Sequence, residues 1–264
     1  MRTDRARRLI VGNWKMNLDQ AGARHLAAAI ATAAKAETYF SDMVICPPYT
    51  LLHAAKEALA GSTIRLGAQD VFWEEKGAFT GKISPGMLVD AGVDYCIVGH
   101  SECRGRFGAG AVEPRLARYF ADDDETVRLK FSALLKHGIK PILCVGETEQ
   151  ERKEGRADQV VHDQVSRVIV ALAEDATGAA VAYEPVWAIG TGQVCDPEEA
   201  ARMAARIREI LDRCRQTGIR VLYGGSVTPE NAEALFAHEE IQGALVGGAS
   251  LRVDSFTTIV RYAG

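Results

Sequence analysis

Short runs of apolar residues recur along the chain, and each run ends in turn residues and is followed by an alanine-rich or charged amphipathic segment. The runs are continuously apolar and do not alternate with polar positions, which is typical of parallel strands covered by helices. The strands predicted in this way span residues 9–12, 43–46, 64–68, 95–99, 141–145, 181–184, 221–223 and 244–246. The pattern therefore contains eight strand and helix pairs.

Eight such pairs predict an α/β fold, a single-domain eight-stranded parallel (β/α)8 barrel. The length of 264 residues fits, because such barrels run to about 250 residues as one unit. An open doubly wound sheet is the rival fold, but no G-x-G-x-x-G sequence follows the first strand. Linkers rich in proline, glycine or serine are absent, so we expect one domain over residues 1–264, with residues 1–8 as a loose N-terminal extension.

Composition and charge narrow the function classes. With 47% hydrophobic and 25% charged residues the chain resembles an ordinary globular protein, and its net charge of −4 comes without a basic stripe. We therefore expect no nucleic-acid partner. The basic start is followed by too short an apolar run for a signal peptide, and no run is long enough to span a membrane. The expected location is the cytoplasm, with no membrane contact.

The six cysteines give no sign of a metal site or a disulfide framework. They form no C-x-x-C pair and no histidine accompanies them at a zinc-site spacing. A disulfide framework is not expected in a chain of this length without an export signal. Cys46, Cys96 and Cys144 lie inside predicted strands, where a thiol acts as a small buried hydrophobe.

In a barrel, the residues that directly follow the strands meet at one rim, whatever their distance in sequence. Gly-Gly pairs follow the seventh and eighth strands and each precedes a helix, an arrangement that favours a bound anion such as phosphate. A tight strand-to-helix turn is the simpler explanation of each pair, but two pairs at neighbouring strand ends favour phosphate. The rim residues are Asn13, Lys15, residues 69–84, His100, Ser101, Glu102, Glu147, Glu184, Gly224, Gly225, Ser226, Gly247 and Gly248.

The stretch from residue 183 to residue 192 places a carboxylate, Glu184, at the end of a buried strand. Pro185 stiffens the chain after it, an apolar tip follows over residues 186–189, and two glycines can act as a hinge. This composition is typical of a lid attached to a general base, which becomes more basic when the lid expels water. An ordinary turn whose tryptophan packs on the core, with Glu184 in an ion pair, is the alternative.

Two further side chains on the rim suit the chemistry of a carbonyl substrate. His100 can polarise a carbonyl as a neutral donor, if a helix N-terminus behind it disfavours the imidazolium. Lys15 can stabilise a developing oxyanion and help to attract a phosphate. A structural histidine and an ordinary surface lysine are the alternatives.

Two other patterns carry no chemistry in our interpretation. Residues 99–103 resemble the G-x-S-x-G nucleophile elbow, but the fifth residue is Cys103 and no aspartate and histidine follow in the required order. Residues 122–125 are acidic but lack the spacing of a calcium loop. They stand before a predicted helix, so we interpret them as a solvated first turn.

Five separate motifs, in order, resemble the triosephosphate isomerase family, and the resemblance extends from about residue 9 to the C-terminus. It implies the TIM-barrel fold and the interconversion of dihydroxyacetone phosphate and D-glyceraldehyde 3-phosphate through an enediolate, a step of glycolysis and gluconeogenesis. No metal and no cofactor are implied. The motifs occupy residues 11–17, 98–102, 182–192, 223–227 and 245–251.

The resemblance also implies a role for each matching residue. Glu184 would move the proton between two carbons, His100 would act at the oxygens, and Lys15 with Asn13 would stabilise negative charge. Six further residues would either hold the phosphate or clamp over the base when the lid closes. Those that would hold the phosphate are Gly190, Ser226, Gly247 and Gly248, and those that would clamp are Ile189 and Leu245.

Members of this family are commonly homodimers in which the loop after the third strand enters the neighbouring site. Residues 77–81 resemble that loop, and Thr80 would meet the partner near Asn13 and Lys15. An exposed Phe79 at the loop tip also favours a partner that covers it.

Two departures from the family pattern lie after the fourth strand. Cys103 stands where the family usually has an arginine, which puts an ion pair there in doubt and leaves Arg104 or Arg106 as substitutes. The segment 105–117 is longer than the usual connection and is a predicted insertion.

Two other functions are weighed against the isomerase. The first is another barrel enzyme that acts on a phosphorylated substrate, such as a sugar-phosphate isomerase or a Schiff-base aldolase. An aldolase needs a lysine deep on a central strand, and the strands after the first contain none. A catalytically silent barrel that only binds a phosphometabolite or a protein is favoured by loss of Lys15, His100 or Glu184, and all three are present.

Overall fold

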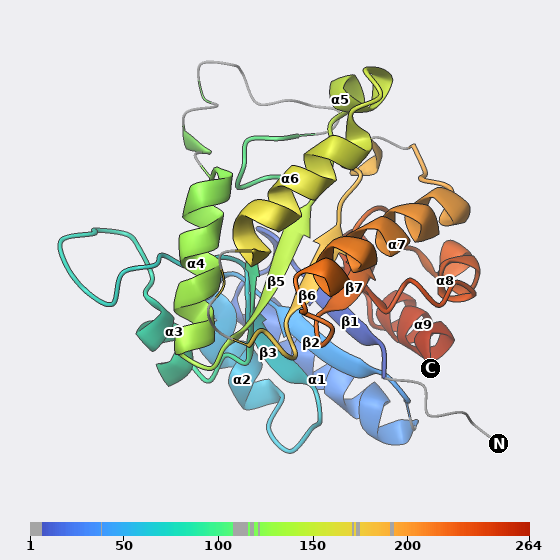
Figure 1. The fold of residues 1–264 in the computed structure, drawn as a ribbon. Coiled ribbons are helices and arrows are strands. Elements are labelled where there is room, and N and C mark those ends of the chain that lie inside the picture. The colour runs from blue at the N-terminus through green and yellow to red at the C-terminus, as the bar shows by residue number, and fades with distance from the viewer. Residues whose placement is uncertain are drawn as a thin grey trace.

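The eight predicted strands form a closed parallel barrel in a computed structural model (Figure 1). The structure describes residues 7–37, 39–107, 116, 119–120, 122–170, 172, 175–190 and 193–264. Each strand pairs with its neighbours in sequence, and β8 closes the barrel on β1, so the predicted (β/α)8 fold, a TIM barrel, is confirmed. The strands are β1 (Leu9–Asn13), β2 (Asp42–Cys46), β3 (Arg65–Ala68), β4 (Tyr95–Val98), β5 (Lys140–Val145), β6 (Ala180–Tyr183), β7 (Arg220–Tyr223) and β8 (Gly243–Val246).

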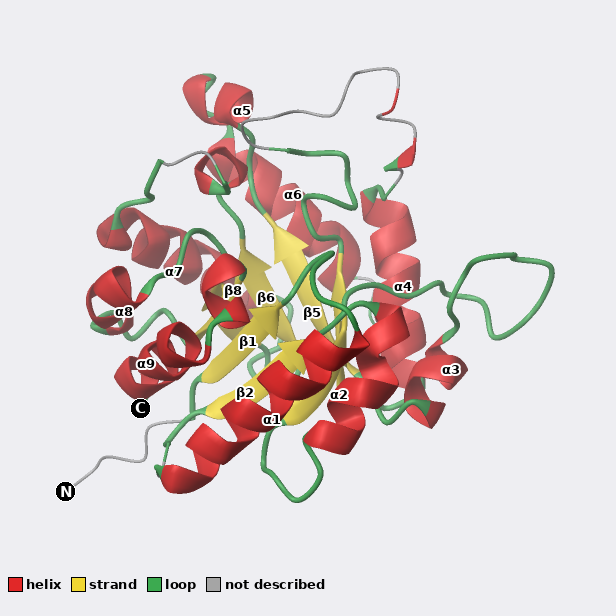
Figure 2. Ribbon diagram, turned by 180° about the vertical axis from the view of Figure 1, so that it is seen from behind, coloured by secondary structure: helices red, strands yellow, loops and turns green. Residues whose placement is uncertain are grey.

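Helices surround the strands on the outside of the barrel (Figures 1 and 2). Several begin at a side chain that accepts a backbone N–H group, as Asp19 does from Gly22 at 2.8 Å. The helices are α1 (Gln20–Ala36), α2 (Leu52–Ala58), α3 (Pro85–Asp90), α4 (Asp124–Lys136), α5 (Glu149–Lys153), α6 (Ala157–Ile169), α7 (Pro197–Arg213), α8 (Pro229–Phe236) and α9 (Val253–Ala263), with 3-10 turns η1 (Tyr49–Leu51), η3 (Val186–Ala188) and η4 (Gly248–Leu251). In the described part of the chain, none of the helices is long and apolar enough to cross a membrane.

The core has two layers, which explains why the strands are apolar on both faces. Leu9 and Val11 of β1 belong to a cluster built from alternate positions of the strands, inside the barrel. Ile10, between them, belongs to the larger cluster that the strands form with the helices. Successive residues of a strand point to opposite faces, so both faces of each strand are buried here.

Charged side chains close the amino-terminal end of the barrel. Arg220 of β7 donates to Asp42 of β2 at 3.0 Å and to the Tyr95 hydroxyl at 3.1 Å. Arg8, in the segment predicted to be a loose extension, donates to the carbonyl groups of Phe236 at 2.7 Å and Ile241 at 3.1 Å. Residues 1–6 of that segment lie outside the described residues.

The connection between β3 and α3, residues 69–84, projects from the barrel (the teal loop of Figure 1). Its residues 74–82 are exposed, and the Phe79 ring packs on Phe72 with 4.8 Å between the ring centroids. Of the predicted insertion 105–117, the described residues are 105–107 and 116. The Phe107 ring meets Phe120 edge to face at 5.0 Å, so the described start of that segment contacts the chain that follows it.

The acidic residues 122–125 lie at the start of α4, with Asp123 as its N-cap and residues 124 and 125 in its first turn. Our interpretation of them as a solvated turn is wrong for Asp122. The Lys130 ammonium, on a side chain only 5% exposed, lies 2.7 Å from carboxylate oxygens of both Asp122 and Asp70. Burial disfavours this cation, but the two carboxylates outweigh burial and raise the pKa of Lys130. Asp70, Asp122 and the Cys103 thiol are near enough to one another to share a metal ion, but Lys130 already supplies their positive charge.

Candidate active site

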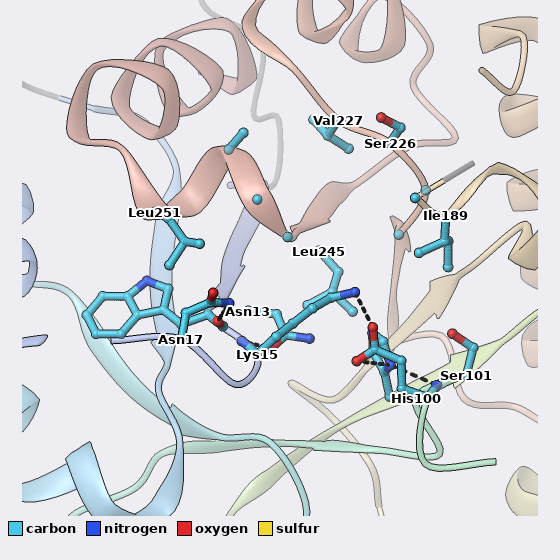
Figure 3. Close-up of a pocket in the computed structure, with 18 of the residues that line it drawn as sticks. Asn13, Lys15, Asn17, His100, Ser101, Ile189, Ser226, Val227, Leu245 and Leu251 are labelled. Carbon is cyan, nitrogen blue, oxygen red and sulfur yellow. Dashed lines mark hydrogen bonds and ion pairs between the residues drawn. The ribbon is translucent and has the colours of Figure 1, made fainter. Parts of the chain in front are cut away.

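A cavity of about 460 Å³ opens at the carboxyl ends of the strands. Its walls come from the segments after β1, β4, β6, β7 and β8, as the barrel topology requires (Figure 3). Glu184 is the one predicted site residue that does not line this cavity, because its carboxylate lies beneath His100 and Ser101. The nine predicted residues that do line it are Asn13, Lys15, His100, Ile189, Gly190, Ser226, Leu245, Gly247 and Gly248.

Lys15 crosses the mouth of the cavity in an unusual backbone conformation (Figure 3). Its φ is +51°, which few residues other than glycine adopt, and neighbouring groups hold it there. The Asn13 carboxamide accepts the Lys15 N–H at 3.0 Å, and Gln69 donates to the Lys15 carbonyl at 2.9 Å. The ammonium then lies 2.6 Å from Glu102 Oε1. The unusual backbone conformation, held by these two hydrogen bonds, thus directs the Lys15 side chain across the cavity.

The imidazole of His100 is held in one tautomer by the chain that follows it. Its Nδ1 accepts the backbone N–H of Glu102 at 3.2 Å, and the side chain is only 8% exposed. A ring nitrogen that accepts a hydrogen bond carries no proton, so the neutral ring carries its proton on Nε2. Behind His100 the structure has a turn over residues 101–105 and not the helix N-terminus that we expected, and the N–H group on Nδ1 comes from this turn.

Glu184 lies against His100 at the end of β6. Its Oε1 is 3.2 Å from His100 Nε2, and its Oε2 accepts the Ser101 N–H at 3.0 Å. The residue is 1% exposed. Its main chain is fixed as well, because its N–H donates to the Val145 carbonyl at 2.7 Å. The base and the imidazole that we predicted from separate motifs are therefore in contact.

In the segment after Glu184 the structure shows the packed turn that we considered as the alternative to a lid. Val186, Trp187 and Ala188 are buried in η3, whereas Gly190 is exposed with φ +67°. Residues 191 and 192, the rest of the predicted hinge, lie outside the described residues. The described part is thus a buried anchor followed by an exposed tip.

Glu147, on the rim after β5, holds this anchor. It is 1% exposed and accepts the Trp187 Nε1–H at 2.7 Å and the Tyr183 hydroxyl at 3.1 Å. Burial raises the pKa of Glu147, and the two hydrogen bonds only partly offset this effect. On the other side the Arg152 guanidinium stacks 3.7 Å from the centroid of the Trp187 ring. The turn that carries Trp187 is therefore attached to the rim at a buried carboxyl group.

The glycines after β8 leave the backbone uncovered in the cavity, whereas those after β7 are packed against Glu184 and Tyr223. A Cβ atom at Gly248 would meet no atom within 4 Å, and one at Gly247 would meet only Lys15 Cε at 3.6 Å. Gly248 also begins η4, and the first N–H groups of a helix have no partner within it. An anion can therefore approach these N–H groups while it stays close to the Lys15 side chain.

Several contacts of the site were not predicted. The pairing of Glu102 with Lys15 and the Ser101 N–H on Glu184 depend on side-chain and backbone directions that the motif does not encode. Arg106 and Phe107 also line the cavity, from the segment predicted to be an insertion. Near the Cys103 departure, Arg104 pairs with Asp124 and Arg106 pairs with Glu151. Burial raises the pKa of the Cys103 thiol to about 12, so this thiol stays protonated at neutral pH.

Comparisons with known proteins agree with this geometry. The family model described as triosephosphate isomerase matches residues 8–263. The triosephosphate isomerase of Trichodesmium erythraeum is 43% identical over 254 residues, which cover 96% of this chain and 98% of the relative. Those of Carboxydothermus hydrogenoformans and Geobacter metallireducens are 44% and 43% identical over 257 and 259 residues, with 96% of this chain covered in both and 97% and 98% of the relatives.

Proposed function

The chain belongs to the triosephosphate isomerase family, and we propose which of its residues carry the reaction of that family. The protein catalyses the interconversion of dihydroxyacetone phosphate and glyceraldehyde 3-phosphate. The observation that carries the proposal is the contact between the buried Glu184 carboxylate and the His100 ring, 3.2 Å apart beside the cavity. A carboxylate and a neutral imidazole in contact provide a base for a carbon-bound proton and a donor for the adjacent oxygen.

Glu184 is the general base of this proposal. Rotation of its side chain away from the Ser101 N–H brings the carboxylate to the cavity, where it takes the proton from one carbon of the substrate and returns it to the next. The electron pair of the broken C–H bond forms the carbon–carbon double bond of the enediolate, while the π pair of the C=O bond moves to the carbonyl oxygen. His100 passes the proton of the neighbouring hydroxyl to that oxygen, so the carbonyl group forms at the other carbon when Glu184 returns its proton. The closed lid excludes water, so the carboxylate is less solvated and more basic.

His100, Lys15 and Asn13 stabilise the charge on the enediolate oxygens. His100 presents its Nε2–H as a neutral donor, because its Nδ1 is already an acceptor for the Glu102 N–H. The Lys15 ammonium supplies a positive charge near both the oxygen and the phosphate. Asn13 contributes by holding the Lys15 backbone through its 3.0 Å hydrogen bond.

The remaining predicted residues bind the substrate. Backbone N–H groups of Gly190, Ser226, Gly247 and Gly248 bind the phosphate, supported by the open backbone after β8 and the position of these residues around one cavity. Ile189 and Leu245 line the same cavity, and they pack over the base when the lid closes. The proposal requires no metal ion and no cofactor.

Replacement of Glu184 by glutamine tests the base. We expect Glu184→Gln to lower kcat on the order of 10²- to 10⁴-fold, as loss of a general base does, in an assay without added metal. Inhibition by inorganic phosphate should stay within twofold, because the phosphate site is intact. Glu209→Gln, which removes an exposed carboxylate of α7, is the matched control and should keep full activity. An unimpaired Glu184→Gln would overturn the assignment.

We also propose that residues 1–264 act as one barrel domain, that the protein is a homodimer and that it works in the cytoplasm. The dimer contact is the loop around Thr80, supported by its exposed residues and by Gln69, at its start, which donates to the Lys15 carbonyl at 2.9 Å. The cytoplasmic location is supported by six free cysteines, which suit a reducing compartment.

A further inference from the structure

A small cavity behind the proposed base collects polar atoms that have no partner. Among the described residues, five buried side-chain nitrogen or oxygen atoms make no hydrogen bond. Three of them, Arg104 Nη2, Arg106 Nε and Glu184 Oε1, belong to residues that line this one cavity. Buried polar groups in native proteins are nearly always paired with protein or with ordered water. Their convergence therefore points to a bound group between them.

The size of the cavity restricts what that group can be. Its volume is about 10 Å³, which is near the smallest volume that holds one water molecule. A phosphate or a carboxylate is too large for it. Two N–H donors face an acceptor across it, and this is the set of partners that an internal water requires.

Arg104 is held in place by two of its nitrogen atoms, and the third, Nη2, is left to donate to a water in the cavity. Its Nε donates to the Gly99 carbonyl at 2.8 Å and its Nη1 to Asp124 at 2.8 Å, and the side chain is 6% exposed. Because the guanidinium is planar, these two bonds also fix the direction of Nη2. Gly99 leaves the space for it, since a Cβ atom there would lie 2.8 Å from Nη2.

We propose that the cavity holds one water molecule that links the Arg104 guanidinium to the Glu184 carboxylate, and that Arg104 is a positioning residue for the base. Glu184 Oε2 accepts the Ser101 N–H, whereas Oε1 lies 3.2 Å from His100 Nε2 but makes no hydrogen bond within the described part of the chain. The water supplies a charge-assisted hydrogen bond to Oε1, so both oxygens of the carboxylate are held. This inference rests on the proposed role of Glu184 as the base.

A high-resolution crystal structure of the wild-type protein tests the water directly. We expect one ordered water within about 2.7–3.2 Å of both Arg104 Nη2 and a Glu184 carboxylate oxygen. A dry cavity, or a water that contacts only one of the two, would overturn the proposal. This experiment does not depend on the folding of any variant.

Kinetics of Arg104→Met tests the positioning role. We expect kcat to fall on the order of tenfold to hundredfold, as misplacement of a reacting group does, while inhibition by inorganic phosphate stays within twofold. Arg104→Gln, which keeps a donor for the Gly99 carbonyl, is the second variant if Arg104→Met does not fold, and the same result is expected. Asp124→Asn removes the charge of the ion pair but keeps an oxygen that accepts from Nη1, so Nη2 stays in place and kcat should stay within twofold.

The outcomes separate this inference from the assignment of the base. An unchanged kcat in the Arg104 variants, or an equal loss in Asp124→Asn, would show that Arg104 only supports the fold of its loop. A fully active Glu184→Gln would instead remove the base itself, whether or not a water is present. A water in place with an inactive Glu184→Gln and slow Arg104 variants supports both.

Discussion

The Lys15 ammonium lies 2.6 Å from Glu102 Oε1, so the cation of the active site has a carboxylate partner within the protein itself. The pair is weak, because the two side chains are 29% and 42% exposed and water screens charges at such a position. A phosphate or an enediolate oxygen can therefore take the place of Glu102. The carboxylate holds the flexible lysine across the cavity until the substrate replaces it.

We therefore expect unequal losses when each member of this pair is replaced. Lys15→Met should lower kcat/KM on the order of 10²- to 10³-fold, or about 3–4 kcal/mol of transition-state stabilisation. Glu102→Gln should cost less than tenfold, since it keeps the backbone N–H that fixes the His100 tautomer. Lys153→Met, on the exposed face of α5, is the control. Equal losses at Lys15 and Glu102 would contradict the proposal that only the cation acts on the substrate.

Gly146 is predicted to be indispensable because β5 and β6 approach each other there. A Cβ atom at this position would lie 1.7 Å from the Glu184 carbonyl oxygen, and both strands are held in register by the barrel. Gly146→Ala should therefore push the base out of place, lower kcat/KM at least 100-fold and destabilise the fold by about 1–3 kcal/mol. Steady-state kinetics and urea unfolding measure the two effects.

Gly86→Ala is the matched control, because a Cβ atom there meets nothing nearer than 3.8 Å. It should change neither activity nor the unfolding midpoint appreciably. Normal activity in Gly146→Ala would show that the backbone around Glu184 yields more easily than the closed barrel implies.

The strands and the rim could be predicted because local sequence encodes both. The run from Leu9 is buried on both faces, and such a run can only be an internal strand. Eight such strands predict a closed barrel, and closure brings Asn13 and His100 to the same cavity. It also brings Lys15 into contact with Glu102, although 87 residues separate the two in sequence. The barrel topology alone therefore predicts which segments form the candidate site.

What could not be predicted depends on the direction of individual side chains. Glu184 was expected at the rim, but its carboxylate faces the Ser101 N–H beneath the cavity, a choice that the backbone of another loop decides. Glu147 was placed on the rim without a role, because only the fold shows that it receives the Trp187 indole N–H. Asp122 was assigned to a solvated turn, since nothing in its neighbourhood in sequence indicates that Lys130 reaches it.

The buried carboxyl group of Glu147 should make stability depend on pH with a particular sign. Its pKa is raised in the folded protein by burial, so the folded state binds this proton more tightly than the unfolded chain does. The stability that this group contributes is therefore present below about pH 4.3, the ordinary glutamate pKa, and is lost as pH rises through the raised value. Above that value the contribution is constant.

Urea unfolding of the wild type and Glu147→Gln at several pH values from 4 to 8 measures this effect. The free energy of unfolding of the wild type minus that of the variant should fall as pH rises, by about 1.4 kcal/mol for each unit by which the pKa is raised. Glu154→Gln is a control of opposite sign. The hydrogen bond from Gln150, with help from Arg156, lowers the pKa of the exposed Glu154 carboxyl. The free energy of unfolding of the wild type minus that of Glu154→Gln should therefore rise with pH. A rising difference for Glu147→Gln would show that its carboxylate is stabilised by the hydrogen bonds more than burial costs it.

The loop of residues 69–84 gives the last prediction, which concerns the proposed dimer. Phe79 at its tip is 42% exposed, and Met16, next to Lys15, is 95% exposed. The loop that carries Phe79 projects from the barrel (Figure 1). Large apolar side chains at such exposure suit a surface that a second copy covers. If the partner's loop supports the segment that carries Lys15, dissociation should disturb the site as well as the interface.

We expect Phe79→Asp to convert a dimer into monomers at micromolar concentration in sedimentation velocity, and to lower kcat/KM in parallel. Burial of an unpaired carboxylate in an apolar interface is costly, whereas the same charge is harmless on a surface that stays in water. Val170→Asp is the control, because Val170 is 66% exposed at the end of α6 and lies on such a surface. This variant should leave the sedimentation coefficient and kcat/KM unchanged. A wild-type protein that sediments as a monomer with full activity would show that the site is complete in one chain, and that the exposed loop has some other use.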